Sequence, residues 1–176
     1  MEVTLARSAG FCFGVARAVH MAEELAASGG PAKMLGHIIH NDHEIARLER
    51  LGLIAISSPE EAEEGDRVLL RAHGAARAVY TALEERGAVP VDATCPKVAR
   101  VQRIVREAER EGRQPLMIGD PGHPEVQGVG GWCMHLQVFS GPEEVSSWLK
   151  TVENATNLPL TVVSQTTLRR EIWESS

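Results

Sequence analysis

Strand-like and helix-like runs alternate along nearly the whole chain, and this alternation limits the fold more than any other feature. Short apolar runs such as Arg67–Ala72 are typical of buried strands, whereas Pro96–Glu111 repeats apolar residues at helical spacing. Strands that alternate with helices pair in parallel, because each helix returns the chain to the same end of the sheet. The sequence therefore predicts an α/β protein whose parallel sheets are flanked by helices.

The predicted elements divide the chain into two small modules. Strands are expected at Val3–Ala6, Lys33–Ile39, Leu53–Ile56, Arg67–Ala72, Val89–Asp92, Leu116–Gly119, Leu136–Phe139 and Pro159–Ser164. Helices are expected at Val15–Ala27, from an Asn41 cap to Gly52, at Ser58–Glu61, at Ala75–Arg86, Pro96–Glu111, Pro124–Val129 and Pro142–Lys150, and from Leu168 to Trp173. We expect the seam near Cys95–Lys97, which gives a first module over residues 1–96 and a second over 97–176.

Composition and charge narrow the class of protein. The net charge of −6 disfavours nucleic acid or an anionic membrane as a partner. No apolar run approaches the length of about 20 residues that spans a bilayer. The first residues lack the basic and then apolar pattern of a signal peptide, and three widely spaced cysteines do not form a disulfide framework. We therefore expect a cytoplasmic protein.

Unusual polar residues follow the ends of the predicted strands. In open parallel sheets, ligands bind outside the carboxyl ends of the strands. The residues expected there are Cys12, His37, His40, His73, Cys95, Asp120, His123, Glu125 and the run Ser164-Gln165-Thr166-Thr167. The pattern predicts that several loops converge on one site that contains thiols, imidazoles, a carboxylate and hydroxyls.

Two of these residues, Cys12 and Cys95, occupy the same kind of corner. Each follows a strand-like run and precedes a helix-like run. A thiol at a helix N-terminus favours its thiolate form, which binds metal or acts as a nucleophile. The pair predicts a metal or redox centre, whereas Cys133, in an apolar stretch, is interpreted as structural.

A zinc site offers another interpretation of the histidines. His37, His40 and His43 are close in sequence, as zinc ligands often are. The change from strand to helix between His40 and His43 disfavours their meeting on one face. The arginines and Lys97 of the helix Pro96–Glu111 alternate with glutamates and are interpreted as a solvent-exposed face.

Six short motifs match one enzyme family in order and over essentially the whole chain. They are Gly10-Phe11-Cys12-Phe13-Gly14-Val15, His40-Asn41, Ala72-His73-Gly74, Asp92-Ala93-Thr94-Cys95-Pro96, Gly122-His123-Pro124-Glu125-Val126-Gln127-Gly128 and Gln165-Thr166-Thr167. Through them the sequence resembles the 4-hydroxy-3-methylbut-2-enyl diphosphate reductases, the last enzymes of the non-mevalonate isoprenoid pathway.

The resemblance implies an oxidoreductase with a [4Fe–4S] cluster that has one open iron. The family removes the allylic hydroxyl of its diphosphate substrate as water and forms isopentenyl and dimethylallyl diphosphates. A ferredoxin or flavodoxin is the implied electron donor. The roles that the resemblance implies are cluster ligation by Cys12 and Cys95, diphosphate binding by His40, His73 and His123, proton relay by Glu125, and substrate positioning by Thr166.

The resemblance also implies a part that this sequence lacks. The family continues past Gln165-Thr166-Thr167 into the rest of the second module and a third module, which carries the third cluster cysteine and a Ser/Asn loop for the diphosphate. Cys133 does not match that third ligand. Three hypotheses stay open: the reductase, represented by its first two modules; a non-catalytic fragment or interaction module that keeps the fold; and a zinc hydrolase that uses His37, His40 and Cys12 or Cys95.

Overall fold

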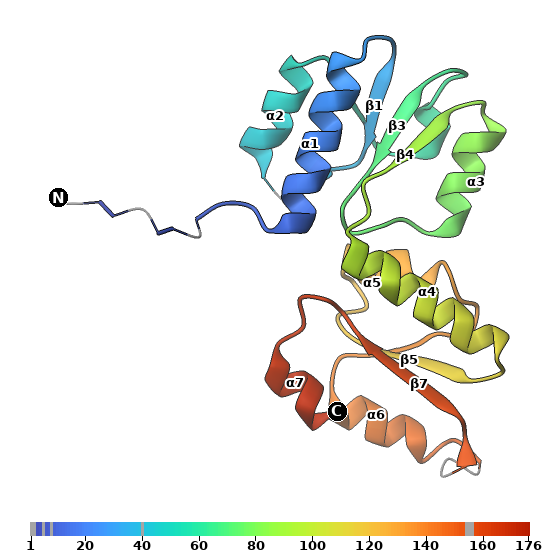
Figure 1. Cartoon of the computed structure of the whole chain (residues 1–176). Coiled ribbons are helices and arrows are strands. Elements are labelled where there is room, and N and C mark those ends of the chain that lie inside the picture. The colour runs from blue at the N-terminus through green and yellow to red at the C-terminus, as the bar shows by residue number, and fades with distance from the viewer. Residues whose placement is uncertain (1–2, 5, 8, 40, 154–156) are drawn as a thin grey trace.

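The computed structural model describes residues 3–4, 6–7, 9–39, 41–153 and 157–176, which form two parallel sheets flanked by helices (Figure 1). The elements of the first sheet region are α1 (Phe13–Ala27), β1 (Ala32–Leu35), α2 (Asp42–Arg50), β2 (Ile54–Ile56), the 3₁₀ helix η1 (Pro59–Glu61), β3 (Arg67–Leu70), α3 (Arg77–Glu85) and β4 (Val89–Asp92). Those of the second are α4 (Pro96–Arg110), β5 (Gln114–Ile118), α5 (Pro124–Gly130), β6 (Gln137–Phe139), α6 (Pro142–Leu149), β7 (Leu160–Ser164) and α7 (Arg170–Ser175). The predicted fold class is confirmed, and the module boundary at residue 96 stays a prediction.

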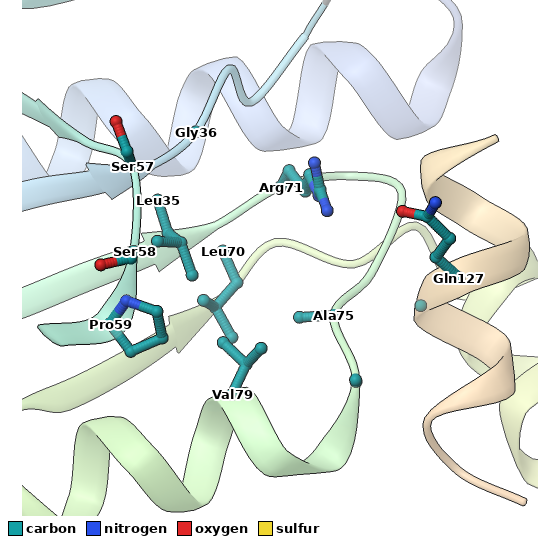
Figure 2. Close-up of a pocket in the computed structure, with 12 residues that line it drawn as sticks. Leu35, Gly36, Ser57, Ser58, Pro59, Leu70, Arg71, Ala75, Val79 and Gln127 are labelled. Atoms are coloured by element: carbon teal, nitrogen blue, oxygen red, sulfur yellow. The ribbon is translucent and has the colours of Figure 1, made fainter. Parts of the chain in front are cut away.

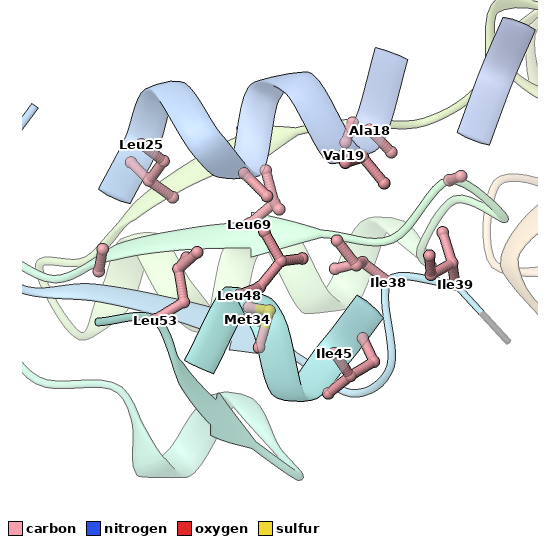
Figure 3. Close-up of a cluster of buried hydrophobic side chains, with 14 residues drawn as sticks. Ala18, Val19, Leu25, Met34, Ile38, Ile39, Ile45, Leu48, Leu53 and Leu69 are labelled. Atoms are coloured by element: carbon pink, nitrogen blue, oxygen red, sulfur yellow. The ribbon is translucent and has the colours of Figure 1, made fainter. Parts of the chain in front are cut away.

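The first sheet has the strand order β2-β1-β3-β4 and is covered on both faces. Successive residues of β3 point to opposite faces, as a strand requires. Leu69 therefore joins Met34 in the core beneath α1 and α2 (Figure 3), whereas Val68 and Leu70 join the core beneath α3. Since the chain leaves β1 and β3 toward opposite edges, their carboxyl ends form a crevice of the kind that binds ligands in α/β proteins.

The second sheet repeats this arrangement with the strand order β6-β5-β7. Met117 of β5 packs in the core with α4 and α5, and its neighbours Leu116 and Ile118 pack on the other face with side chains of α6 and α7. The chain leaves the central strand β5 toward β6 and then crosses to β7 on the other side of β5. Because the strand order reverses there, the carboxyl ends of β5 and β7 form a second crevice.

The predicted first strand is wrong. Within the range Val3–Ala6, the described residues Val3, Thr4 and Ala6 belong to no strand, and Val3 is 79% exposed. Figure 1 shows the segment before α1 running away from the first sheet. A strand is stabilised by hydrogen bonds to a neighbouring strand, and the described residues before α1 pair with neither edge of the sheet. Cys12 therefore follows an extended segment and not a strand.

The predicted strand Lys33–Ile39 is shorter than expected. β1 stops at Leu35 because Gly36 has φ +65°, a left-handed conformation that glycine adopts without strain. The chain then turns, and Ile38 and Ile39 pack into the core outside the strand. The residues of the apolar run after Leu35 thus contribute to the core but not to the sheet. The helix that follows begins as predicted, because the Asn41 side chain accepts a hydrogen bond from the Glu44 N–H at 3.1 Å.

The two sheet regions meet where α5 packs on the loop after β3. A Cβ on Gly128 would lie 2.9 Å from the Gly74 carbonyl oxygen, and one on Gly131 would overlap Ala76. The Trp132 indole N–H donates to the Ala75 carbonyl at 2.9 Å. These contacts bring the carboxyl edges of both sheets to a common boundary.

Candidate functional site

The two predicted thiols lie at helix N-termini that adjoin. Cys12 directly precedes α1 and Cys95 directly precedes α4, so each thiol lies at the N-terminus of a helix. A Cβ on Gly14 would lie 2.7 Å from Cys95 Sγ, which shows how closely the thiol packs on the start of α1. Arg17 of α1 also donates to the Thr94 carbonyl at 3.2 Å. Cys12 is exposed and Cys95 is partly exposed, and neither forms a disulfide.

The His73 loop lies beside the Cys95 corner. The Cys95 N–H donates to the Ala72 carbonyl at 2.9 Å, and the Ala72 N–H donates to the Ile38 carbonyl at 3.5 Å. These bonds extend the pairing of the sheet past the ends of its strands. Three chain segments that carry predicted site residues are therefore held side by side. His40, the diphosphate ligand predicted from sequence on the first of them, lies outside the described residues.

His73 and His123 come from different sheets and meet at the boundary between them. Their rings are 5.6 Å apart between centroids, in an edge-to-face arrangement with an interplanar angle of 84°. His123 directly precedes α5, and its Nδ1 accepts a hydrogen bond from the Glu125 N–H at 3.1 Å. Because Nδ1 accepts, a neutral His123 carries its proton on Nε2, which is then a hydrogen-bond donor.

Glu125 is 2% exposed, and both of its oxygens are bonded to Thr166. The Thr166 N–H donates to Oε1 at 2.6 Å, and the Thr166 hydroxyl donates to Oε2 at 2.7 Å. A buried carboxylate requires such partners, because leaving it without hydrogen bonds costs several kcal/mol. The pair joins the first turn of α5 to the loop after β7 and supplies a carboxyl and a hydroxyl side by side.

Gln165 was part of a motif but was not predicted as a site residue. It is 8% exposed, its Oε1 accepts from the Asp120 N–H at 3.0 Å, and its Nε2 donates to the Thr167 hydroxyl at 2.9 Å. The amide therefore ties the loop after β5 to the loop after β7, on either side of Thr166. The signal available in the sequence was a glutamine between two hydroxyl residues, Ser164 and Thr166.

A cavity of about 230 Å³ opens beside His73. Its walls are mostly apolar, and its polar members are Asn41 and His73; the apolar ones are Phe11, Val15, Ile38, Ile39 and Ala72. A small cavity with apolar walls and few polar groups suits a ligand with a short hydrocarbon part.

Comparison with known proteins identifies the family. A family model described as LytB protein matches residues 3–175, nearly the whole chain. The chain belongs to the LytB family. Two curated LytB relatives, each named 4-hydroxy-3-methylbut-2-enyl diphosphate reductase, come from Caldanaerobacter subterraneus, with 40% identity, and Aquifex aeolicus, with 39% identity; each match covers 99% of this chain and 60% of the relative.

Solved LytB structures share the fold. The reductase from Plasmodium falciparum has a TM-score of 0.86 at 26% identity over 96% of this chain and 52% of that chain. A second structure, titled as the terminal enzyme of the non-mevalonate pathway, has a TM-score of 0.82 at 39% identity over 98% of this chain and 60% of that chain. This LytB chain thus spans about 60% of the length of its curated relatives.

The donor set of this LytB chain fits part of an iron–sulfur cluster site. Cys12 and Cys95 are thiols at the N-termini of two helices that meet at Gly14 and Cys95, and thiolates are the usual ligands of such clusters. Among the described residues, no group of three or more His, Cys, Asp or Glu side chains is arranged to hold a metal ion. Cys133 is buried in the core between α4 and the second sheet, as predicted for a structural cysteine. Two of the three thiols therefore lie at the N-termini of neighbouring helices, and the third lies in the core.

Other predicted residues lie apart from the site or cannot be placed. His37 and His43 are both exposed. The zinc hypothesis also requires His40, which lies outside the described residues, so it stays a hypothesis. Within the described ranges, none of the helices is both long and apolar enough to cross a membrane.

Proposed function

We propose that this chain forms the part of a 4-hydroxy-3-methylbut-2-enyl diphosphate reductase that binds the diphosphate and delivers protons. The observation that carries the proposal is the hydrogen-bonded pair of buried Glu125 and exposed Thr166. The pair lies next to His123, whose ring meets that of His73 at the boundary between the sheets. Family membership supports the reaction class, because the curated relatives are named for this reductase.

Cys12 and Cys95 are proposed to hold two irons of a [4Fe–4S] cluster. When bound, the cluster supplies electrons and a Lewis-acid iron for the substrate hydroxyl. The third thiolate is expected from the part of the longer reductase that this chain does not span. A ferredoxin or flavodoxin is proposed as the source of the electrons.

His73 and His123 are proposed to bind the diphosphate, together with His40. The Nε2–H of His123 donates to a phosphate oxygen of the substrate. The short helix α5 orients His123 through the Glu125 N–H, so the ring is fixed before substrate arrives. Imidazoles thereby bind a strongly anionic substrate on a chain whose net charge is −6.

Glu125 and Thr166 are proposed to deliver protons to the departing hydroxyl. Removal of the hydroxyl as water consumes two electrons and two protons, one for the oxygen and one for the carbon. Glu125 in its protonated form supplies the proton for the oxygen. The Thr166 hydroxyl donates to Oε2 in this structure; to relay the proton, it turns to accept the proton of Glu125 and gives its own to the departing hydroxyl. Burial keeps bulk water away from the Glu125 carboxyl, whereas Thr166 is exposed.

Anaerobic reconstitution of the chain with iron and sulfide tests the cluster proposal. Absorption, EPR and metal analysis should show cluster iron that is lost in the Cys12→Ser and Cys95→Ser variants, with Cys133→Ser as the control that retains it. Absence of iron uptake, in this chain and in the complete reductase, would favour the alternative of a non-catalytic fragment or interaction module. Stoichiometric zinc with hydrolase activity would favour the third hypothesis.

Glu125→Gln in the complete reductase tests the proton proposal. Turnover should fall by about 10²-fold or more while the cluster spectrum stays unchanged, because the amide cannot release a proton. Glu171→Gln, a change to an exposed carboxylate, should retain wild-type turnover. A normal rate for Glu125→Gln would contradict the relay.

A further inference from the structure

A second cavity lies at the carboxyl edge of the first sheet, on the face that α3 covers. It has a volume of about 300 Å³ and is lined by the ends of β1, β2 and β3 and by α3 (Figure 2). Its floor is apolar, and the side chains that form it are Leu35, Pro59, Leu70, Ala75 and Val79. The volume is at the lower end of the range for small-molecule sites.

Arg71 is the cationic side chain among the residues that line this cavity. Figure 2 shows the Arg71 guanidinium between the Gly36 turn and Gln127 of α5. The Arg71 side chain makes no hydrogen bond or ion pair within the described part of the chain, so its five N–H donors are available to a ligand. The Gln127 amide provides a further donor on the same side.

Two glutamates, Glu60 and Glu61, adjoin the Ser57–Ser58 side of the cavity without lining it. The N–H groups of Ser57 and Ser58 donate to the Glu61 carboxylate at 2.9 and 3.1 Å. The pKa of Glu60 lies below its ordinary value because the Ser58 side chain bonds to its carboxylate, so a second negative charge lies beside Ser58 and outside the cavity lining. Because Arg71 is the charged residue among those that line the cavity, an anionic group is attracted toward the Arg71 side.

We propose that this cavity binds a small amphiphilic anion, with a carboxylate or phosphate head on Arg71 and an apolar body of about six carbons on the floor. The guanidinium binds an oxyanion through two parallel hydrogen bonds. The apolar chain of the ligand moves out of water and packs against Leu35, Leu70 and Val79. The cavity is distinct from the one beside His73, with which it shares no lining residue.

Titration with hexanoate and with 3-methylbutyl phosphate tests the proposal on the 176-residue chain. Either probe should saturate at one per chain and shift the methyl NMR signals of Leu35, Leu70 and Val79. Acetate, which lacks the chain, and hexanol, which lacks the charge, should each bind about tenfold more weakly or worse. Binding of hexanoate alone identifies a carboxylate site, and binding of the phosphate alone identifies a phosphate site.

Variants separate the site from general surface binding. Arg71→Gln should weaken binding about tenfold, since it removes the charged partner of the head group. Arg77→Gln, the same change at an exposed position outside the cavity, should leave affinity within about twofold. Val79→Phe fills the floor and should abolish binding with Arg71 intact. Equal affinity of the wild type and both cavity variants, or failure of both probes to saturate, would overturn the proposal.

Discussion

At the scale of single residues, Glu125 shows how hydrogen bonds orient a buried carboxyl group in this fold. The carboxylate lies at the start of a helix and receives two donors from one threonine on a distant loop. Neither donor comes from a lysine or arginine. The arrangement keeps the carboxyl in one orientation, which a proton donor requires.

Thr166→Val tests this arrangement. The substitution keeps the N–H donor and removes the hydroxyl, so one oxygen of the buried carboxylate loses its partner. We expect the free energy of unfolding to fall by about 1 to 3 kcal/mol in urea titrations. Thr81→Val, at an exposed position of α3, is the control and should change stability by less than about 0.5 kcal/mol. An unchanged stability for Thr166→Val would mean that water replaces the hydroxyl.

A second buried carboxylate, Asp66, is structural. It is 3% exposed and accepts from Lys33 Nζ at 2.7 Å and from the Glu63 N–H at 2.7 Å. Burial raises the pKa of the Asp66 carboxyl, but the hydrogen bonds from Lys33 and Glu63 lower it by more, so its pKa in the folded chain is below the ordinary value. The ionised group therefore stabilises the fold.

The stability of the chain should consequently fall in acid. The contribution of Asp66 is complete above the pKa of the unfolded chain, about 4, and is lost as pH falls through the lower pKa of the folded state. Asp66→Asn should reduce the free energy of unfolding by roughly 3 kcal/mol at pH 6 and by less at pH 3, as measured by urea titration at each pH. Glu84→Gln, at an exposed carboxylate, should keep the wild-type pH dependence.

At the scale of elements, α5 links the chemistry to the packing. Its first turn carries Glu125, and one turn later Gly128 allows the helix backbone to approach the loop of His73 and Gly74. A longer side chain at that position would meet carbonyl oxygens, which cannot rotate away. The distance between the His73 and His123 rings thus depends on the absence of one Cβ.

Gly128→Ala should separate the two histidines. We expect a loss of about 1 to 3 kcal/mol in stability and weaker binding of inorganic pyrophosphate, measured by thermal unfolding and by calorimetry. Gly130→Ala, in the same helix, introduces a Cβ that meets nothing within 4 Å and should be neutral or slightly stabilising. Equal effects of the two substitutions would show that helix propensity, and not the contact, matters.

The elements that the sequence predicted best carry their own local signals. α4 begins at Pro96 and α2 begins after Asn41, as expected from a proline at the first helical position and from an Asn cap. The range Val3–Ala6 failed because an apolar run does not reveal whether a partner strand exists. Lys33–Ile39 was too long because burial continues after the strand ends at Gly36.

The positions of most candidate site residues could also be predicted from local signals, whereas their roles stay predictions. Sequence placed Cys12, His73, Cys95, His123, Glu125 and Thr166 at loops after expected strands, and all but the first follow observed strands. What it could not reveal is which partners meet across the two sheets. The Gly128 contact with Gly74 crosses between the sheet regions, and the Asp120–Gln165 bond joins two loops of the second sheet. Each joins residues more than forty positions apart, and no local pattern encodes such a separation.

At the scale of the whole molecule, the boundary between the sheets is small but specific. Trp132 donates to the Ala75 carbonyl, packs edge-to-face on Tyr80 at 5.7 Å, and lies beneath the Arg106 guanidinium. One aromatic side chain therefore contacts both sheet regions. The regions are expected to unfold together only as long as this contact holds.

Trp132→Ala should convert one unfolding transition into two. Each sheet region has its own cores, so removing the shared contact leaves both folded but uncoupled. Calorimetry should resolve two peaks, and Trp173→Ala, near the end of α7, should retain one. A single shifted peak for Trp132→Ala would show that the remaining contacts suffice for cooperativity.

The tight contact between Gly131 and Ala76 has a consequence for the history of the family. Because a Cβ at position 131 would overlap the methyl group at 76, the two sites cannot both carry side chains of this size or larger. In related sequences, a gain of volume at one position should accompany a loss at the other. Positions 76 and 131, which belong to two different sheet regions, would then vary as a pair across lineages.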